Sequence, residues 1–99
     1  MADQPQNHDG AVSRTVIILN QRGLHARASA KFCAVAASWD ADVRVTKDEF
    51  TVGGKSIMGL LMLGAGRGAE ITISAAGPQA QEAVETLTRL VAEKFGEDE

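Results

Sequence analysis

The sequence predicts an α+β two-layer sandwich with the element order β-α-β-β-α-β-α. Four short segments have the β-branched or alternating apolar pattern of strands. Three further segments have helical spacing, and the first and third carry a single apolar face that a sheet would cover. The chain has 99 residues, of which 44% are apolar, so we expect one small domain with its own core.

The two ends of the chain differ in composition from the rest. Residues 1–12 are rich in Gln, Asn, Asp, Gly and Pro, and they predict a disordered lead in which His8 is solvated. Residues 13–95 form the folded domain. Residues 96–99 are an acidic tail, which we expect to be frayed.

The first half of the domain reads as a strand, a helix and a hairpin. Residues 15–19 are β-branched and almost continuously apolar, which predicts a strand inside the sheet. Residues 27–38 predict an alanine-rich helix with Cys33 as a small core residue rather than a reactive thiol. Its inner face comprises Ser29, Phe32, Cys33 and Ala36. Alternation over 42–47, followed by a short turn and 50–52, predicts the hairpin.

A short helix is predicted over residues 57–63, because Ser56 before an apolar run is typical of an N-cap. This helix is apolar nearly all round, so it is either buried completely or exposes a small interaction patch. Residues 70–74 alternate as a strand. The last helix is predicted to begin with Pro78 at its first position. Its apolar stripe comprises Ala80, Ala83, Val84, Leu87, Leu90, Val91 and Phe95.

Composition excludes several classes of protein. The formal charge is −3 and the isoelectric point about 5.3, which argues against a nucleic-acid binder. The polar N-terminal stretch does not resemble a signal peptide, and no apolar run reaches membrane-spanning length. The single cysteine allows no internal disulfide, so we expect a cytoplasmic protein.

The stretch 20–29 holds the residues that favour a chemical function. Gly23 supplies a turn, and His25 stands where a helix begins, two residues before Arg27. The first N–H groups of a helix have no internal partner and attract anions such as phosphate. A neutral imidazole nitrogen is a nucleophile, so the pattern indicates a surface histidine that accepts a phosphoryl group. His25 and Arg27 are the candidate site residues.

The sequence offers few residues suited to a metal site or to a hydrolase triad. Too few His, Cys and carboxylate groups stand at ligand spacing for a metal site, and we expect no cofactor. No acidic residue stands near His25 in the sequence to complete a hydrolase triad. The segment 10–39 has no Asp or Glu but contains four basic residues. It suits an anionic group or an acidic partner, unless the distribution is only uneven by chance.

Two stretches resemble the histidine-containing phosphocarrier (HPr) family of the phosphoenolpyruvate-dependent phosphotransferase system. They are Gly23-Leu24-His25-Ala26-Arg27 and the run from Gly54 through Ser56 to Gly64. They stand about thirty residues apart, as in that family, and the similarity extends from about residue 13 to residue 95. The resemblance implies an antiparallel four-stranded sheet in an open sandwich with all three helices on one face.

The family also implies a function for particular residues. His25 would accept phosphate on Nδ1 from phosphorylated enzyme I and pass it to enzyme IIA domains, with help from Arg27. Ser56 would be a regulatory site for the HPr kinase/phosphorylase. The implied protein is a monomeric carrier rather than an enzyme that turns over. The partner-binding surface would comprise Ala26, Ala30, Ile57, Met58 and Leu61.

Two other functions fit the same residues. One is a non-catalytic α+β interaction module that uses the short helix 57–63, with His25 incidental. The other is a regulatory domain that binds a small ligand or an anion at a helix N-terminus. A test for phosphate on His25 separates the carrier from both.

Overall fold

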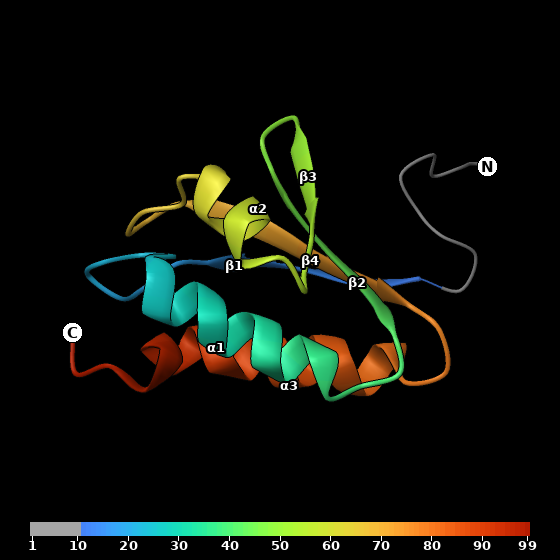
Figure 1. Cartoon of the computed structure of the whole chain (residues 1–99). Coiled ribbons are helices and arrows are strands. Elements are labelled where there is room, and N and C mark those ends of the chain that lie inside the picture. The colour runs from blue at the N-terminus through green and yellow to red at the C-terminus, as the bar shows by residue number, and fades with distance from the viewer. Residues whose placement is uncertain (1–10) are drawn as a thin grey trace.

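The computed structural model describes residues 11–99, and its elements follow the predicted order (Figure 1). His8 and the rest of 1–10 lie outside the described residues. The strands are β1 (Val12–Ile17), β2 (Asp42–Lys47), β3 (Phe50–Gly53) and β4 (Glu70–Ala76). The helices are α1 (Ala26–Ala37), α2 (Ile57–Met62) and α3 (Ala80–Ala92), followed by a short 3-10 turn, η1 (Lys94–Gly96). Val12, which we assigned to the disordered lead, is the first residue of β1.

The four strands form one antiparallel sheet in the order β1-β4-β2-β3. This order corrects our placement of the first strand, because β1 lies at an edge rather than inside the sheet. The apolar run misled the prediction because it continues past the strand into the loop. Ile18 there is fully buried, whereas Ile17 and Leu19 on either side are exposed. Alternation rather than continuous burial is the pattern expected of such an edge.

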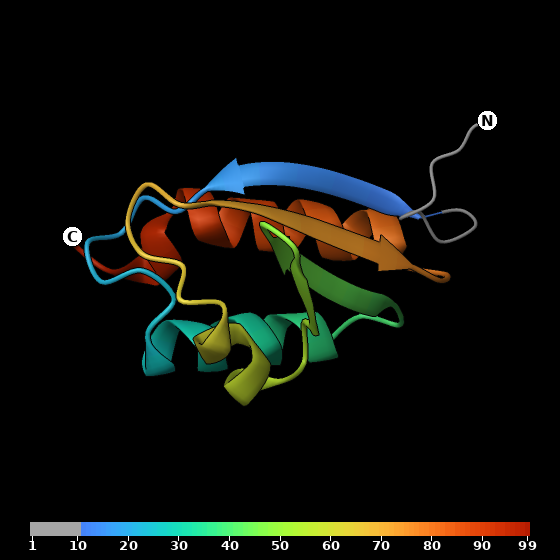
Figure 2. The ribbon, with the colours of Figure 1, turned by 90° about the horizontal axis from the view of Figure 1, so that it is seen from above.

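All three helices lie on one face of the sheet, which makes the two-layer open sandwich (Figure 2). α1 and α3 run side by side along this face, and α2 packs against α1 and β3. The predicted inner face of α1 is confirmed, since all four residues are buried. Burial raises the pKa of the Cys33 thiol, as expected for a core residue rather than a nucleophile.

The short helix α2 is exposed rather than buried, which decides between the two alternatives for it. Only Leu60 is buried within α2. Ile57, Met58, Leu61 and Met62 are exposed, and Met62 reaches 78%. Ser56 is the N-cap as predicted, and its hydroxyl oxygen accepts a hydrogen bond of 3.0 Å from the Gly59 N–H.

The C-terminal segment departs from two predictions. α3 begins at Ala80 after an N-cap at Gln79, so Pro78 precedes the helix instead of opening it. The acidic tail is not frayed. After α3 the backbone turns through three left-handed residues, Lys94, Phe95 and Gly96, with φ of 59°, 57° and 79°. Phe95 is almost completely buried, and this anchors the residues that follow.

None of the helices within 11–99 is both long and apolar enough to cross a membrane.

Candidate functional site

A tight turn before α1 positions the histidine. Gly23 has a φ of +67°, and a Cβ on it would lie 2.7 Å from the Gly66 Cα, so only glycine fits here. The next residue, Leu24, donates a 2.9 Å hydrogen bond from its N–H to the Ala65 carbonyl oxygen. His25 follows as the N-cap of α1 in an extended conformation. The loop therefore fixes where the imidazole leaves the backbone.

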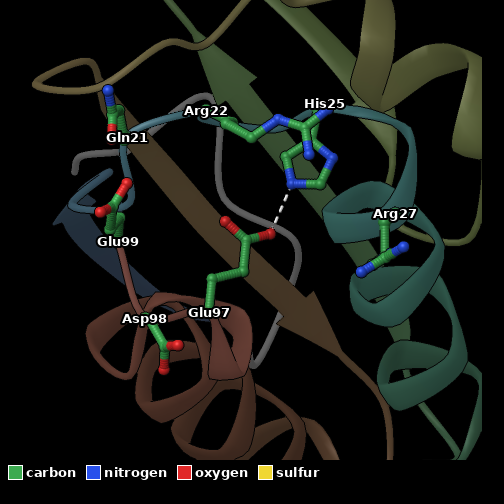
Figure 3. A pocket seen from close by; sticks show the side chains of 7 residues that line it. All are labelled: Gln21, Arg22, His25, Arg27, Glu97, Asp98 and Glu99. Carbon is green, nitrogen blue, oxygen red and sulfur yellow. Dashed lines mark hydrogen bonds and ion pairs between the residues drawn. The ribbon is translucent and has the colours of Figure 1, made fainter.

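The His25 ring is hydrogen-bonded at Nε2 to a carboxylate oxygen of Glu97 (Figure 3). The other oxygen of Glu97 accepts a 3.0 Å bond from the Asn20 side-chain amide. The same amide donates to the Gly23 carbonyl oxygen at 2.8 Å, and Asn20 is fully buried. Asn20 therefore connects the turn, the carboxylate and, through the carboxylate, the ring.

Glu97 is held in its charged form. Desolvation alone would raise the pKa of the Glu97 carboxyl, but the hydrogen bonds from His25 and Asn20 lower it. The positive charge of Arg22 acts in the same direction, and the pKa lies below its ordinary value of 4.5. A carboxylate only accepts hydrogen bonds, so the neutral ring beside it carries its proton on Nε2.

Two further hydrogen bonds hold the tail beside the ring. The Lys31 ammonium of α1 donates a 2.7 Å hydrogen bond to the Phe95 carbonyl oxygen. The Gln21 N–H donates to the Glu99 carbonyl oxygen, so the tail lies along the loop before α1. With buried Phe95, these contacts bring the acidic tail to the basic segment that the sequence singled out. The charge pattern of 10–39 thus has a partner within the chain itself.

A pocket opens beside the ring, lined by Gln21, Arg22, His25, Arg27, Glu97, Asp98 and Glu99 (Figure 3). The His25 side chain is 15% exposed, so the ring is neither sealed in the core nor freely solvated. Its side chain makes no hydrogen bond to the helix, which leaves the first N–H groups of α1 without a side-chain cap. Within 11–99, Nδ1 has no hydrogen-bond partner.

This arrangement suits an electrophile with negative oxygens. Nδ1 carries the lone pair, because Nε2 holds the proton that faces Glu97. The bare N–H groups at the start of α1 and the guanidinium of Arg27 are donors for anionic oxygens. Within 11–99, no group of three or more His, Cys, Asp or Glu side chains is arranged to hold a metal ion.

Comparison with known proteins identifies the family. A family model described as the PTS HPr component phosphorylation site matches residues 12–93. The phosphocarrier protein HPr of Cupriavidus necator is 43% identical over 88 residues, which cover 89% of this chain and 99% of the relative. The chain belongs to the HPr family of phosphocarrier proteins.

Solved structures of HPr proteins have a similar fold. The crystal structure of an HPr from Thermoanaerobacter tengcongensis matches with a TM-score of 0.85 at 39% identity, over 89% of this chain and 99% of that one. A second HPr structure from the same organism is a dimer, with a TM-score of 0.71 at 40% identity over 83% of this chain and 94% of that one. HPr is a component of the phosphotransferase system and not itself a catalyst.

The predicted site residues of this HPr lie in two neighbouring places. His25 and Arg27 line one pocket at the start of α1, whereas Ser56 caps α2. α2 packs against α1, and Figure 2 shows it beside the first half of that helix. The predicted partner surface is solvent-accessible throughout, and it comprises Ala26, Ala30, Ile57, Met58 and Leu61.

Sequence reasoning missed two residues of the site, Asn20 and Glu97. Asn20 ends an apolar run and has no distinguishing pattern. Glu97 lies 72 residues from His25 in a segment with the composition of a solvated tail. The only available signal was the complementary charge of the two segments.

Proposed function

We propose that this HPr accepts a phosphoryl group on Nδ1 of His25 from phosphorylated enzyme I and passes it to enzyme IIA domains. The observation that supports the proposal is the hydrogen bonding of the two nitrogens of the His25 ring. Nε2 is bound to Glu97, while Nδ1 has no partner among residues 11–99. The nucleophilic nitrogen stands at an uncapped helix start, which can receive the oxygens of a phosphoryl group.

Arg27 is the second charged element of this proposal. It stands in the first turn of α1, lines the pocket and is exposed. A guanidinium donates paired hydrogen bonds to phosphoryl oxygens and carries a full positive charge, which backbone N–H groups lack. We infer that Arg27 stabilises the charge on the phosphoryl group during transfer rather than holding the ring.

The deciding experiment is incubation with phosphoenolpyruvate and enzyme I. We expect an acid-labile phosphate on wild-type protein and none on His25→Ala. Arg27→Ala is expected to accept phosphate more slowly. A matched control is Arg14→Ala, because Arg14 is exposed on β1 and does not line the pocket. An acid-labile phosphate that persists in His25→Ala would overturn the assignment.

Ser56 is proposed as the regulatory site of the HPr kinase/phosphorylase. Ser56 is exposed, and the N-terminus of a helix tolerates a phosphate electrostatically, so the fold should survive phosphorylation. About two added negative charges beside the exposed apolar side chains of α2 would oppose partner docking. ATP with a competent kinase should give an acid-stable phosphate on wild type and none on Ser56→Ala.

The docking surface is proposed to join the start of α1 to α2. Ile57 and Met58 are exposed there, and exposed apolar side chains grouped on one short helix are typical of interaction sites. The same observation favours the second candidate, a plain interaction module. That candidate predicts partner binding without any phosphate on His25, so the labelling experiment separates the two.

We further propose that the protein acts as a monomer in the cytoplasm. The carrier function requires the His25 pocket and α2 to be accessible to successive partners. Sedimentation equilibrium of the wild-type protein over a range of concentrations tests the monomer. A stable dimer that buries α2 would contradict it.

A further inference from the structure

We propose that Glu97 is a positioning residue for phosphoryl transfer at His25. It holds the ring proton on Nε2 and so keeps Nδ1 available as the nucleophile. This inference rests on the proposed function, because it concerns the same histidine. The proposal adds a carboxylate of the acidic tail, 72 residues from His25, to the functional site.

The Glu97 carboxylate fixes the tautomer of the His25 ring. A neutral imidazole carries one proton, and the nitrogen without it is the nucleophile. The Glu97 carboxylate bonds to Nε2 and can only accept, so it selects the tautomer with the proton there. A carboxylate acts on the imidazole in the same way in serine hydrolases, where it orients the ring and fixes its tautomer.

The His25 ring gains positive charge during transfer. Nδ1 donates its electron pair to phosphorus, and the bond from phosphorus to the donor group breaks, with its electron pair leaving on the donor. The Nε2 proton stays in place throughout. The ring becomes positively charged as the new N–P bond forms, and the negative Glu97 beside Nε2 stabilises that charge. The carboxylate therefore interacts more strongly with the transition state than with the resting ring.

The fold holds the Glu97 carboxylate in place. Its second oxygen accepts from Asn20, which is completely buried. The segment reaches the ring through left-handed backbone at Lys94 and Phe95, a conformation that costs about 1–2 kcal/mol per non-glycine residue. Such strain persists only where the surroundings enforce it, and it is common at functional sites. Burial of Phe95 and the hydrogen bond from Lys31 supply that enforcement.

Other charged groups face the same pocket. Arg22 comes from the loop before the histidine, Arg27 from α1, and Asp98 and Glu99 from the tail (Figure 3). Within 11–99, only the Glu97 side chain bonds to the ring. Glu49 provides a control, since it is an exposed carboxylate in the turn between β2 and β3 and does not line the pocket.

The test compares single-turnover phosphorylation of the full chain in three variants: Glu97→Ala, Glu97→Gln and Glu49→Ala. We expect Glu97→Ala to slow the transfer step about 10–100-fold, the loss typical when the carboxylate that orients a metal-binding histidine is removed. The apparent affinity for the donor should not change. Glu97→Gln presents a donor as well as an acceptor to Nε2, so it no longer selects the tautomer and should also slow transfer. Glu49→Ala should match wild type.

A second readout does not depend on transfer. The ¹⁵N chemical shifts of the His25 ring report which nitrogen carries the proton in the neutral form. We expect almost exclusive protonation at Nε2 in wild type, and a mixture of tautomers in Glu97→Gln and Glu97→Ala. Wild-type transfer rates and an unchanged tautomer in Glu97→Ala would overturn this inference alone. A wild-type protein that takes no phosphate on His25 would overturn the proposed function, and this inference with it.

Discussion

The Nε2 atom of His25 and a carboxylate oxygen of Glu97 form a hydrogen bond between residues 72 positions apart in the chain. The bond closes the C-terminal segment onto the start of α1. Because one partner is an acid whose pKa is lowered, the closure must respond to pH.

Stability should therefore depend on pH through Glu97. A carboxyl whose pKa is lowered by folding stabilises the protein fully above its unfolded value, here about 4.5, and this stabilisation is lost as the pH falls through the lower folded value. Glu97→Gln is expected to be less stable than wild type near neutral pH, and the two should converge below pH 4.5. Urea denaturation over an acid series measures this. A difference that stays constant with pH would contradict the prediction, and Asp98→Asn is the control.

The N-cap of α2 can be tested by replacing Ser56. Loss of the bond from Gly59 in Ser56→Ala should lower the free energy of unfolding by about 1 kcal/mol. Ser56→Asp should lower it less, because aspartate also caps helices. Ser38→Ala removes an exposed hydroxyl at the end of α1 and should change stability by less than about 0.5 kcal/mol. Equal loss in all three variants would mean that Ser56 is not an effective cap.

Three glycines allow a graded test of the two loops that meet beside His25, with Gly23 before α1 and Gly64 and Gly66 after α2. Gly23→Ala combines positive φ with a backbone clash, so we expect severe destabilisation or no folding. Gly64→Ala has positive φ but open space, so it should lose about 1 kcal/mol. Gly66→Ala has open space and no positive φ, so its stability should stay close to wild type. Thermal denaturation should rank the three in this order, and any other order would contradict the geometry.

The two sides of α2 should respond differently to substitution. Met58 is 68% exposed, so Met58→Ser should leave the free energy of unfolding within about 0.5 kcal/mol of wild type and raise the KM of enzyme I for this protein. Leu60 is fully buried, and Leu60→Ala should lose about 2–5 kcal/mol. Denaturation and phosphorylation kinetics measure both effects. A wild-type KM for Met58→Ser would remove Met58 from the docking surface.

Elements with a strong local pattern could be predicted from the sequence. The helix at 27–38 and the hairpin starting at 42 agree with α1 and β2–β3 within one residue. The position of β1 could not be predicted, because sheet order depends on pairing with β4 far along the chain. An apolar run looks the same in an interior strand as in an edge strand that leads into a buried loop.

Only the part of the site at the start of α1 could be predicted from the sequence. His25 and Arg27 stand at a helix start that the sequence indicates directly. Glu97 depends on a left-handed turn at Lys94 and Phe95, a conformation that non-glycine residues rarely adopt. An acidic run after the last helix is typical of a solvated tail, so no local sequence pattern predicts that this run lies beside the His25 ring.

The central place of β4 in the sheet also bears on synthesis. β4 pairs with β1 on one side and β2 on the other, although it is the last strand in the sequence. A nascent chain ending before Glu70 contains only the β2–β3 pair, and an isolated hairpin is marginally stable in water. The sheet therefore closes only after β4 has been synthesised, and the domain should fold as one cooperative unit.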